Sequence, residues 1–484
     1  MPINSLLYPS NVFVPTTFNV DNSVRFNSGS SDYLSKTFST TGNRQKFTLS
    51  MWIKRGIIPV GNQSGTERML FQAYQDGSNQ DQIWLQSNGT INYVRNDANA
   101  VTPSPVFGDS SAWYHVVFAG DTTQGSNADR LKVYVNGTQA PIAQGDTIAQ
   151  NSNFGAINNA QSYTFGKRNS NDWYFDGYMA ETIMVDGQQL APTSFGEFDE
   201  DSGIWKPIDV SGLTFGTNGF YLEFKQSGTG TNASGIGADT SGNNHHFAVT
   251  NLTAVDQSTD TCTNNFATWN SLQPTNATMT EGNLVGASSA SSGHYSGISS
   301  IGVSSGKWYF ECKQIQESAS NEGMIGIIIF YNTVTALLNP VGRGGAWGMQ
   351  DGNRGFSTNS GGSGSTTDNF HAGWSNNDTI GIALDIDNSR VYYSKGGQWN
   401  NSGSWNAANP TTSQTLQNAL GDGTYFFMAG DASGSNNCTW SANFGSPAHA
   451  ISSGNQDADG FGNFEYAVPS GYFALCTKNL AEYG

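Results

Sequence analysis

The amino-acid sequence predicts an all-β protein made of two tandem antiparallel β-sandwiches. Three observations lead to this fold class. The chain contains 58 glycines, which together with many Ser, Asn and Thr residues are spread along its whole length rather than gathered in one linker. Short segments alternate apolar and polar residues with a period of two, as half-buried strands do. No helical period extends beyond a turn or two, and glycine-containing turn pairs typical of hairpins follow many of these segments.

One strand pattern occurs twice and indicates two successive sandwiches. At residues 130–137 the sequence RLKVYVNG places three apolar side chains on one side of a strand. Asn136 and Gly137 then suit a type I′ hairpin, which requires positive φ at both central residues. About 260 residues later, SRVYYSKGG at residues 389–397 repeats the same strand and glycine turn.

Composition limits the classes of partner. The formal charge is −17, and only 12% of the residues are charged, which argues against nucleic acid and anionic membranes as partners. No run approaches the ~18 apolar residues of a membrane helix, so we expect no membrane insertion. The first cation is Arg25, so the N-terminus lacks the basic region of a secretory signal. The four cysteines show no metal-binding spacing and are expected to be free thiols of a protein folded in a reducing cytosol.

Residues 1–20, MPINSLLYPSNVFVPTTFNV, are apolar and marked by prolines, with too few charges for a free tail. Two interpretations remain open. The segment is either an extended arm that docks on a neighbouring protein or the first edge strand of the domain that follows.

Residues 21–195 form the first predicted sandwich. Its strand-like blocks include SMWIKRG, then AWYHVVFAGD followed by LKVYVNG, and finally FDGYMAETIMVDGQQL. These blocks, in this order, resemble the laminin-G/concanavalin-like jelly roll. That fold hosts lectins, adhesion modules and glycosidases alike, so the resemblance implies a fold and not an activity.

Three further segments complete the predicted organisation. Residues 196–255 contain the Gly/Ser/Asn stretch GTGTNASGIGADTSGNNHHF and are interpreted as a bridge between domains. Residues 256–450 form the second sandwich, and residues 451–484 a C-terminal segment. The order GKWYFECKQ, GMIGIIIF, DTIGIALDIDNSRVYYSKGG and a closing NFG resembles the SPRY domain, another two-sheet sandwich. That resemblance implies loops that bind protein partners and no shared catalytic apparatus.

We do not expect the chain to be an enzyme. A jelly-roll glycosidase needs two carboxylates facing each other across a cleft, ~5–5.5 Å apart when configuration is retained. The nearest sequence match, EFDED from Glu197 to Asp201, lacks the final Glu at the required step. No Gly-x-Ser-x-Gly elbow occurs, and the six histidines have no evident nucleophile partner. His115 lies inside a strand-like segment and is interpreted as a packed residue.

A calcium loop is the one metal site that the sequence suggests. Asn455, Asp457 and Asp459 precede Gly460, so oxygen-bearing side chains alternate as calcium loops prefer. The twelfth position is Tyr466 instead of a bidentate Glu, and the match is incomplete. The alternatives are therefore a bound Ca²⁺ and a solvated Asx turn, the latter being the default. No cofactor is required.

Four aromatic residues are candidate ligand-binding residues: Trp173, Tyr174, Trp347 and Trp399. They lie among Gly, Asn and Asp, at positions expected to be exposed loop tips. Sugar sites combine a flat aromatic face with amide and carboxylate hydrogen-bonding groups, because pyranose rings present C–H faces and hydroxyl rims. The alternative for each tryptophan is that it anchors its own loop to the sandwich.

The two modules, with the phrases DTSGNNHHF, TNNFATWNSL and PSGYFALCTKNL, resemble virion proteins of tailed bacteriophages. The resemblance implies a non-enzymatic tail fibre or surface appendage on the virion exterior, made in the host cytoplasm and released by lysis. The implied partners are other virion proteins, host cell-surface polysaccharide and further copies of the chain, with a trimer favoured by analogy with phage fibres. Two alternatives remain: a capsid decoration or fibre protein with an assembly or stabilising role, and a polysaccharide depolymerase.

Overall fold

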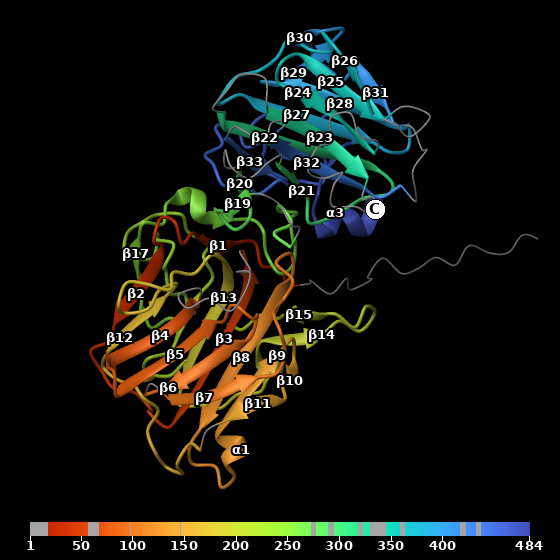
Figure 1. Ribbon diagram of the computed structural model, residues 1–484. Coiled ribbons are helices and arrows are strands. Elements are labelled where there is room, and N and C mark those ends of the chain that lie inside the picture. Colours follow the sequence, from red (N-terminus) through yellow and green to blue (C-terminus); the bar gives the residue numbers. More distant parts are fainter. Residues whose placement is uncertain are drawn as a thin grey trace, which may run out of the picture.

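The computed structural model describes residues 18–56, 67–96, 98–145, 147–272, 277–288, 295–317, 323–329, 345–358, 364–416, 423–431 and 437–484. Nearly all of its regular elements are antiparallel strands, and they form two sandwiches that lie end to end (Figure 1). The predicted fold class is therefore confirmed. Among the described residues, no helix is both long enough and apolar enough to cross a membrane.

The first sandwich consists of two large sheets. One has the order β10 (Thr138–Gln139), β9 (Leu131–Val135), β8 (Trp113–Asp121), β3 (Lys46–Arg55), β13 (Gly177–Asp186), β1 (Ser23–Phe26) and β18 (Gln257–Ser258), with β16 (Phe220–Leu222) also paired to β13. The other has the order β11 (Ile142–Gly145), β7 (Ala98–Pro103), β6 (Ile91–Arg95), β5 (Asn79–Leu85), β4 (Arg68–Asp76), β12 (Ser162–Phe165), β2 (Tyr33–Thr37) and β17 (Ala248–Thr250). A short helix, α1 (Asn127–Arg130), lies between β8 and β9.

The alternating strand patterns have the predicted consequence for burial. Phe47, Leu49, Met51 and Ile53 of β3 are fully buried in the core between the two sheets, because alternate side chains of a strand face the same side. The turn at Asn136-Gly137 has φ values of 45° and 78°, as a type I′ hairpin requires. Strands β8 and β9 pair as predicted from the repeated pattern.

The second sandwich also has two sheets. The larger has the order β19 (Ala277–Thr280), β20 (Val285–Ser288), β33 (Cys438–Asn443), β22 (Lys307–Glu317), β27 (Thr379–Asp385), β28 (Arg390–Lys395), β29 (Gln398–Asn401) and β30 (Ser404–Ala407), with β31 (Ser413–Thr415) on β28 and β34 (Phe473–Ala474) on β22. The smaller has the order β21 (Tyr295–Ile298), β32 (Tyr425–Asp431), β23 (Gly323–Ile329), β24 (Ala346–Gln350), β25 (Arg354–Thr358) and β26 (Gly364–Thr367). Strands β27 and β28 form the second predicted hairpin.

The structure places the segment expected as a bridge, residues 196–255, largely on the first sandwich. It contributes the hairpin of β14 (Gly196–Phe198) and β15 (Trp205–Pro207), while β16 pairs with β13 and β17 pairs with β2. The short helical turns η1 (Pro192–Ser194) and η2 (Ala254–Asp256) flank this region. Strands of three residues between Gly- and Asn-rich turns carry too short a pattern to reveal their partners in the sequence.

The C-terminal residues 451–484 pack on the second sandwich. Strand β34 runs parallel to β22, and helix α3 (Thr477–Tyr483) follows it. Phe464, Tyr472 and Cys476 belong to a buried cluster with Tyr309 of β22. All four cysteines are unpaired thiols, as the sequence predicts.

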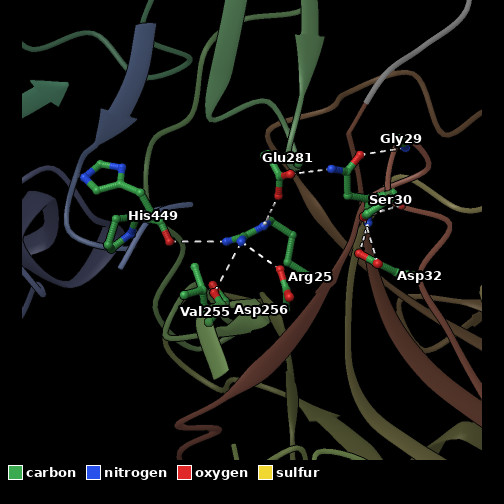
Figure 2. Close-up of polar contacts among 12 residues, drawn as sticks. Arg25, Gly29, Ser30, Asp32, Val255, Asp256, Glu281 and His449 are labelled. Carbon is green, nitrogen blue, oxygen red and sulfur yellow. Dashed lines mark hydrogen bonds and ion pairs between the residues drawn. The ribbon is translucent and has the colours of Figure 1, made fainter. Parts of the chain in front are cut away.

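A buried arginine joins the two sandwiches. Arg25 of β1 is 1% exposed and makes four hydrogen bonds with its guanidinium group (Figure 2). Its Nη2 donates to Asp256 at 2.9 Å and to the Val255 carbonyl at 3.2 Å. Its other nitrogens reach the second sandwich, where Nε donates to Glu281 and Nη1 to the Pro447 carbonyl, both at 3.2 Å.

A buried lysine reinforces the same junction. Lys54 of β3 is fully buried, and its Nζ donates to Asp260 and Asn265, both at 2.7 Å, and to the Phe266 carbonyl at 3.1 Å. Buried charges are tolerated only when they are paired and hydrogen-bonded. These two cations therefore define how the sandwiches sit against each other.

Candidate functional site

Two of the four predicted aromatic residues are buried rather than exposed. Trp347 of β24 is 0% exposed in the core of the second sandwich, and Trp399 of β29 is 4% exposed in the cluster that contains Tyr309. The prediction of exposed loop tips is wrong for both. Gly345 and Gly397, each two residues before its tryptophan, have positive φ. Each tryptophan is the second residue of the strand that follows and faces a core.

Trp173 and Tyr174 remain as candidates, because both are only partly buried. They lie between β12 and β13, where Trp173 has a φ of 54°. A left-handed backbone is an outlier for so bulky a side chain and persists only where its surroundings impose it. Its carbonyl accepts a hydrogen bond from the Met69 amide at 2.8 Å. The strained backbone thus holds the indole over the outer face of β4 and β5.

The indole of Trp173 has a defined setting. The ring of Trp84 in β5 lies 5.2 Å away at an interplanar angle of 66°. The guanidinium carbon of Arg168 lies 3.9 Å from the centre of the Trp173 ring. Asp172 accepts two hydrogen bonds from Arg168, at 2.8 and 2.5 Å, and both side chains are partly exposed. We refer to Trp84, Arg168, Asp172, Trp173 and Tyr174 as the Trp173 site.

Hydrogen bonds anchor the loop that carries this site. The Asn169 amide donates to Gln72 Oε1 at 2.6 Å, and Gln72 Nε2 donates to Gln80 Oε1 at 3.1 Å. Lys167 Nζ donates to Asn171 at 2.6 Å. The two Gln side chains are buried and pair with one another. Arg168 and Asp172, whose side chains are 30% and 42% exposed, keep polar groups within reach of a ligand.

Asp457, the central residue of the predicted calcium loop, has its carboxylate engaged by donors of the protein. Asp457 is 8% exposed, and its two carboxylate oxygens accept four hydrogen bonds from nitrogen donors: the amides of Asp459, Phe461 and Ala474 and the side chain of Asn479. A carboxylate that already accepts four bonds has no lone pair for a metal. Asn455 donates its side-chain amide to the carbonyls of Phe464 and Glu465. In the described part of the chain, no cluster of three His, Cys, Asp or Glu side chains could hold a metal ion.

One serine–histidine pair resembles a catalytic dyad but has the wrong proton arrangement. Ser50 Oγ lies 2.8 Å from His115 Nε2, and Trp205 Nε1 donates to His115 Nδ1 at 3.0 Å. An indole nitrogen can only donate, so Nδ1 accepts and the proton of the neutral ring is on Nε2, facing Ser50. Burial lowers the pKa of His115 to about 3. The imidazole therefore cannot take the serine proton, and His115 is a packed residue, as the sequence indicates.

A buried acid in β13 also has a structural setting. Glu181 is 5% exposed, lies at an irregularity in the pairing of β13 with β3, and has a φ of 46°. Tyr221 donates its hydroxyl to this carboxyl group. Burial raises the pKa of Glu181 to about 7. Asp186, on the same strand, instead accepts backbone hydrogen bonds from Asn43 and Asn218, so the two acids do not form a catalytic pair.

A groove of about 570 Å³ lies between the first sandwich, the β14–β15 hairpin and the start of α3. Its walls include Trp52, Trp113, Trp205, Phe198 and Ile204. The indole nitrogens of Trp113 and Trp205 donate to Asp260 and His115 inside the protein. The walls are therefore mainly apolar ring faces. The sequence offered no signal for this groove, because its residues come from strands that are distant in the chain.

Comparison with known proteins supports the fold predicted for the first sandwich. Residues 27–188 match the family model Laminin_G_3, described as the Concanavalin A-like lectin/glucanases superfamily. The first sandwich is therefore a concanavalin-like jelly roll. No curated protein matches the chain.

Several solved structures are similar at low identity. The SPRY domain of human HERC1 is 13% identical with a TM-score of 0.25, covering 33% of this chain and 87% of that one. The TRIM65 PSpry domain is 13% identical with a TM-score of 0.26, covering 37% and 91%. The native heptameric SAP-like pentraxin from Limulus polyphemus is 14% identical with a TM-score of 0.27, covering 36% and 78%. At these TM-scores the likenesses carry no argument about function.

Proposed function

We infer that the chain is a non-enzymatic structural protein of a bacteriophage virion, a tail fibre or surface appendage, and that its first sandwich binds host-surface glycans at the Trp173 site. The virion assignment is supported by the resemblance of the two modules and their connecting phrases to phage proteins. The glycan assignment is supported by the concanavalin-like family match and by the chemistry of the site.

The observation that carries the glycan proposal is the partly exposed Trp173 with its left-handed backbone. An indole held in place by Trp84 and Arg168 loses little conformational freedom when a ligand binds, which favours affinity. The ring offers an apolar surface for sugar C–H groups, and the exposed parts of Arg168 and Asp172 offer a donor and an acceptor for hydroxyl groups. A neutral or mixed-charge polysaccharide suits this pair of opposite charges.

Binding of the full chain to purified host envelope polysaccharide tests this proposal. Trp173→Ala is expected to weaken binding by about 1–3 kcal/mol, because truncating an aromatic interface anchor typically costs this much. The matched control is Phe198→Ala, which removes an aromatic side chain that is 52% exposed on the separate β14–β15 hairpin. Melting temperatures are measured in parallel, and binding is compared at equal folded concentration. A Trp173→Ala variant that loses stability but binds normally would refute glycan recognition at this site.

The virion assignment has its own test. Labelled antibody against the chain is expected to decorate the exterior of intact particles from the phage that encodes it. Particles that carry no label, together with free protein in the lysate, would overturn the assignment whatever the glycan assay shows.

An assembly role, as in a capsid decoration protein, is the second candidate. The observation that favours it is the exposed apolar hairpin, in which Phe198 and Ile204 are 52% and 67% exposed. Exposed apolar groups beside a groove are typical of protein contact surfaces. Virions whose Trp173 site has been removed can be tested for stability and for adsorption to the host. Stable particles that adsorb normally would support the assembly role.

A further inference from the structure

A pocket of about 290 Å³, separate from the aromatic groove, lies on the outer face of the larger sheet in the second sandwich. Trp308, Phe310 and Cys312 of β22 face the core between the sheets, so the odd-numbered residues of this strand face outward. We refer to the pocket as the Lys313 pocket. Its walls are mainly polar and include Lys313, Thr379, His449, Glu465 and Tyr466.

The C-terminal segment covers the neighbouring part of this face and forms one wall of the pocket. Glu311, two residues before Lys313 on the same face of β22, is 0% exposed. Its carboxylate accepts hydrogen bonds from the amides of Glu465 and Tyr466, at 2.9 and 2.8 Å. Lys313 itself is only partly buried. Its side chain therefore lies at the edge of the covered area, beside Glu465 and Tyr466.

Strand register fixes the side chains on the other wall. Lys313 of β22 lies opposite Thr379 of β27 and opposite Ser441 of β33. Directly opposite residues of antiparallel strands have Cβ atoms about 4.5–5.5 Å apart and lie on the same face. Ser441 Oγ lies 2.8 Å from His449 Nδ1. The sheet thus brings an ammonium group, a hydroxyl group and an imidazole ring to one place.

The ammonium group of Lys313 has no counterion in the described part of the chain. Among the described residues, its Nζ forms no hydrogen bond and no ion pair. Glu465, the acid of the same pocket, instead accepts hydrogen bonds from the hydroxyl and the amide of Ser452. These hydrogen bonds hold the pKa of Glu465 below its usual range, so its carboxylate is ionised. The pocket therefore combines an unpaired cation with an anion that the protein already holds.

The remaining polar groups can also donate hydrogen bonds. Burial lowers the pKa of His449 to about 4, so at pH 7 its ring is neutral and carries one proton. When Ser441 donates its hydroxyl to Nδ1, that proton is on Nε2 and is available to a ligand. The hydroxyl groups of Thr379 and Tyr466 form no hydrogen bond with any residue that the structure describes. Several donors therefore accompany the ammonium group.

These groups match a sugar residue that carries one carboxylate. A carboxylate accepts strong, charge-assisted hydrogen bonds from a cation, and protein hydroxyl groups both donate to and accept from sugar hydroxyl groups. A second negative charge, as on a phosphate monoester, would be repelled by the ionised Glu465. The volume is near the lower limit of small-molecule sites, which is about 300 Å³, and suits one sugar residue.

We propose that the Lys313 pocket binds a hexuronate residue, with its carboxylate at Lys313 and His449 and its hydroxyl groups toward Thr379 and Tyr466. The pocket shares no residue with the Trp173 site and lies in the other sandwich. The two sites differ in what they recognise, since the first offers an aromatic face and the second an unpaired positive charge. Binding at either site can be lost without loss of the other.

Calorimetric titration of the full chain with sodium glucuronate, glucose, acetate and glucose 6-phosphate tests the class of ligand. Glucuronate is expected to bind at least about tenfold more tightly than glucose, because hydrogen bonds to charged groups are the stronger ones. It should also bind more tightly than acetate, which has no hydroxyl groups, and than glucose 6-phosphate, which carries a second charge. No binding of glucuronate, or equal or tighter binding of any of the other three, would overturn the proposal.

Two variants test whether this pocket is the site. Lys313→Gln removes the charge but keeps most of the side chain, and is expected to weaken glucuronate binding about tenfold. The matched control is Lys36→Gln, which removes the same charge from a partly exposed lysine of β2 in the first sandwich. Normal binding by the Lys313→Gln variant, or an equal loss in both variants, would mean that glucuronate does not bind at Lys313.

A third variant changes the selectivity of the pocket instead of removing its cation. Glu465→Gln is expected to raise the affinity for glucose 6-phosphate relative to that for glucuronate, because the repulsion of the second charge is gone. Melting temperatures are measured in parallel, and all affinities are compared at equal folded concentration. An unchanged ratio of the two affinities would contradict the placement of the ligand beside Glu465, even if the Lys313→Gln protein failed to fold.

Discussion

Replacing Arg25 by Met is the sharpest test of how the sandwiches are joined. The substitution keeps most of the side-chain volume but removes a guanidinium that pairs with Asp256 at 2.9 Å and Glu281 at 3.2 Å. It also leaves two carbonyl groups without their donor. Removing one partner of a buried ion pair typically costs about 3–5 kcal/mol. The side chains of Asp256 and Glu281 are 11% and 25% exposed, so water can reach them in part, and we expect about 3 kcal/mol.

The control is the same substitution at an exposed ion pair. Arg354 and Asp368 are 3.1 Å apart, with side chains 45% and 73% exposed, and Arg354→Met is expected to cost less than about 1 kcal/mol. Urea unfolding of both variants, followed by tryptophan fluorescence, gives the free energies of unfolding. If Arg25→Met costs no more than Arg354→Met, the junction does not depend on the buried guanidinium and the reasoning is wrong.

Two further predictions concern buried acids. Burial raises the pKa of Glu181 to about 7, so its proton stabilises the folded state at low pH, and this contribution is lost as pH rises from the unfolded value of about 4.3 through 7. We expect the free energy of unfolding to fall by roughly 3 kcal/mol over this range through Glu181 alone. The fall should be smaller in the Glu181→Gln variant. Equal falls in urea titrations of the two proteins would contradict this prediction. Asp457 is expected to stabilise the C-terminal segment through four hydrogen bonds and not through a metal. Asp457→Ala should therefore lower the melting temperature while calcium and EDTA leave the wild-type value unchanged, and a calcium-dependent rise would restore the cation site.

Local patterns predicted much of the fold because strand geometry is encoded in neighbouring residues. The alternation in β3 and the turn at Asn136-Gly137 depend only on positions a few residues apart, and both are found as expected. The strand partners of residues 196–255 do not follow from local patterns. Strands β16 and β17 have three residues each and pair with strands far away in the sequence. Such pairing depends on contacts that a local pattern cannot contain.

In the candidate sites, too, local patterns predicted the turns but not the tertiary surroundings of the side chains. Gly and Asn near a tryptophan indicate a turn, but they do not tell on which side of the turn the ring lies. Trp347 and Trp399 face cores, whereas Trp173, which has a left-handed backbone, stays partly exposed. The alternating oxygens of Asn455 and Asp457 look like cation ligands in sequence. In the fold the Asp457 carboxylate accepts hydrogen bonds from nitrogen donors, and Asn455 donates its side-chain amide to a carbonyl group.

By itself the sequence determined the all-β class, the two successive sandwiches and the acidic, sparsely charged composition, since these follow from periodicity, turn residues and residue counts. Only the tertiary structure decided which aromatic rings reach the surface, which charges are buried and where the groove lies. Arg25 and Glu281 are 256 residues apart in the chain and 3.2 Å apart in space. The burial of such a pair depends on how the two sandwiches pack, and this depends on all of their surface residues at once.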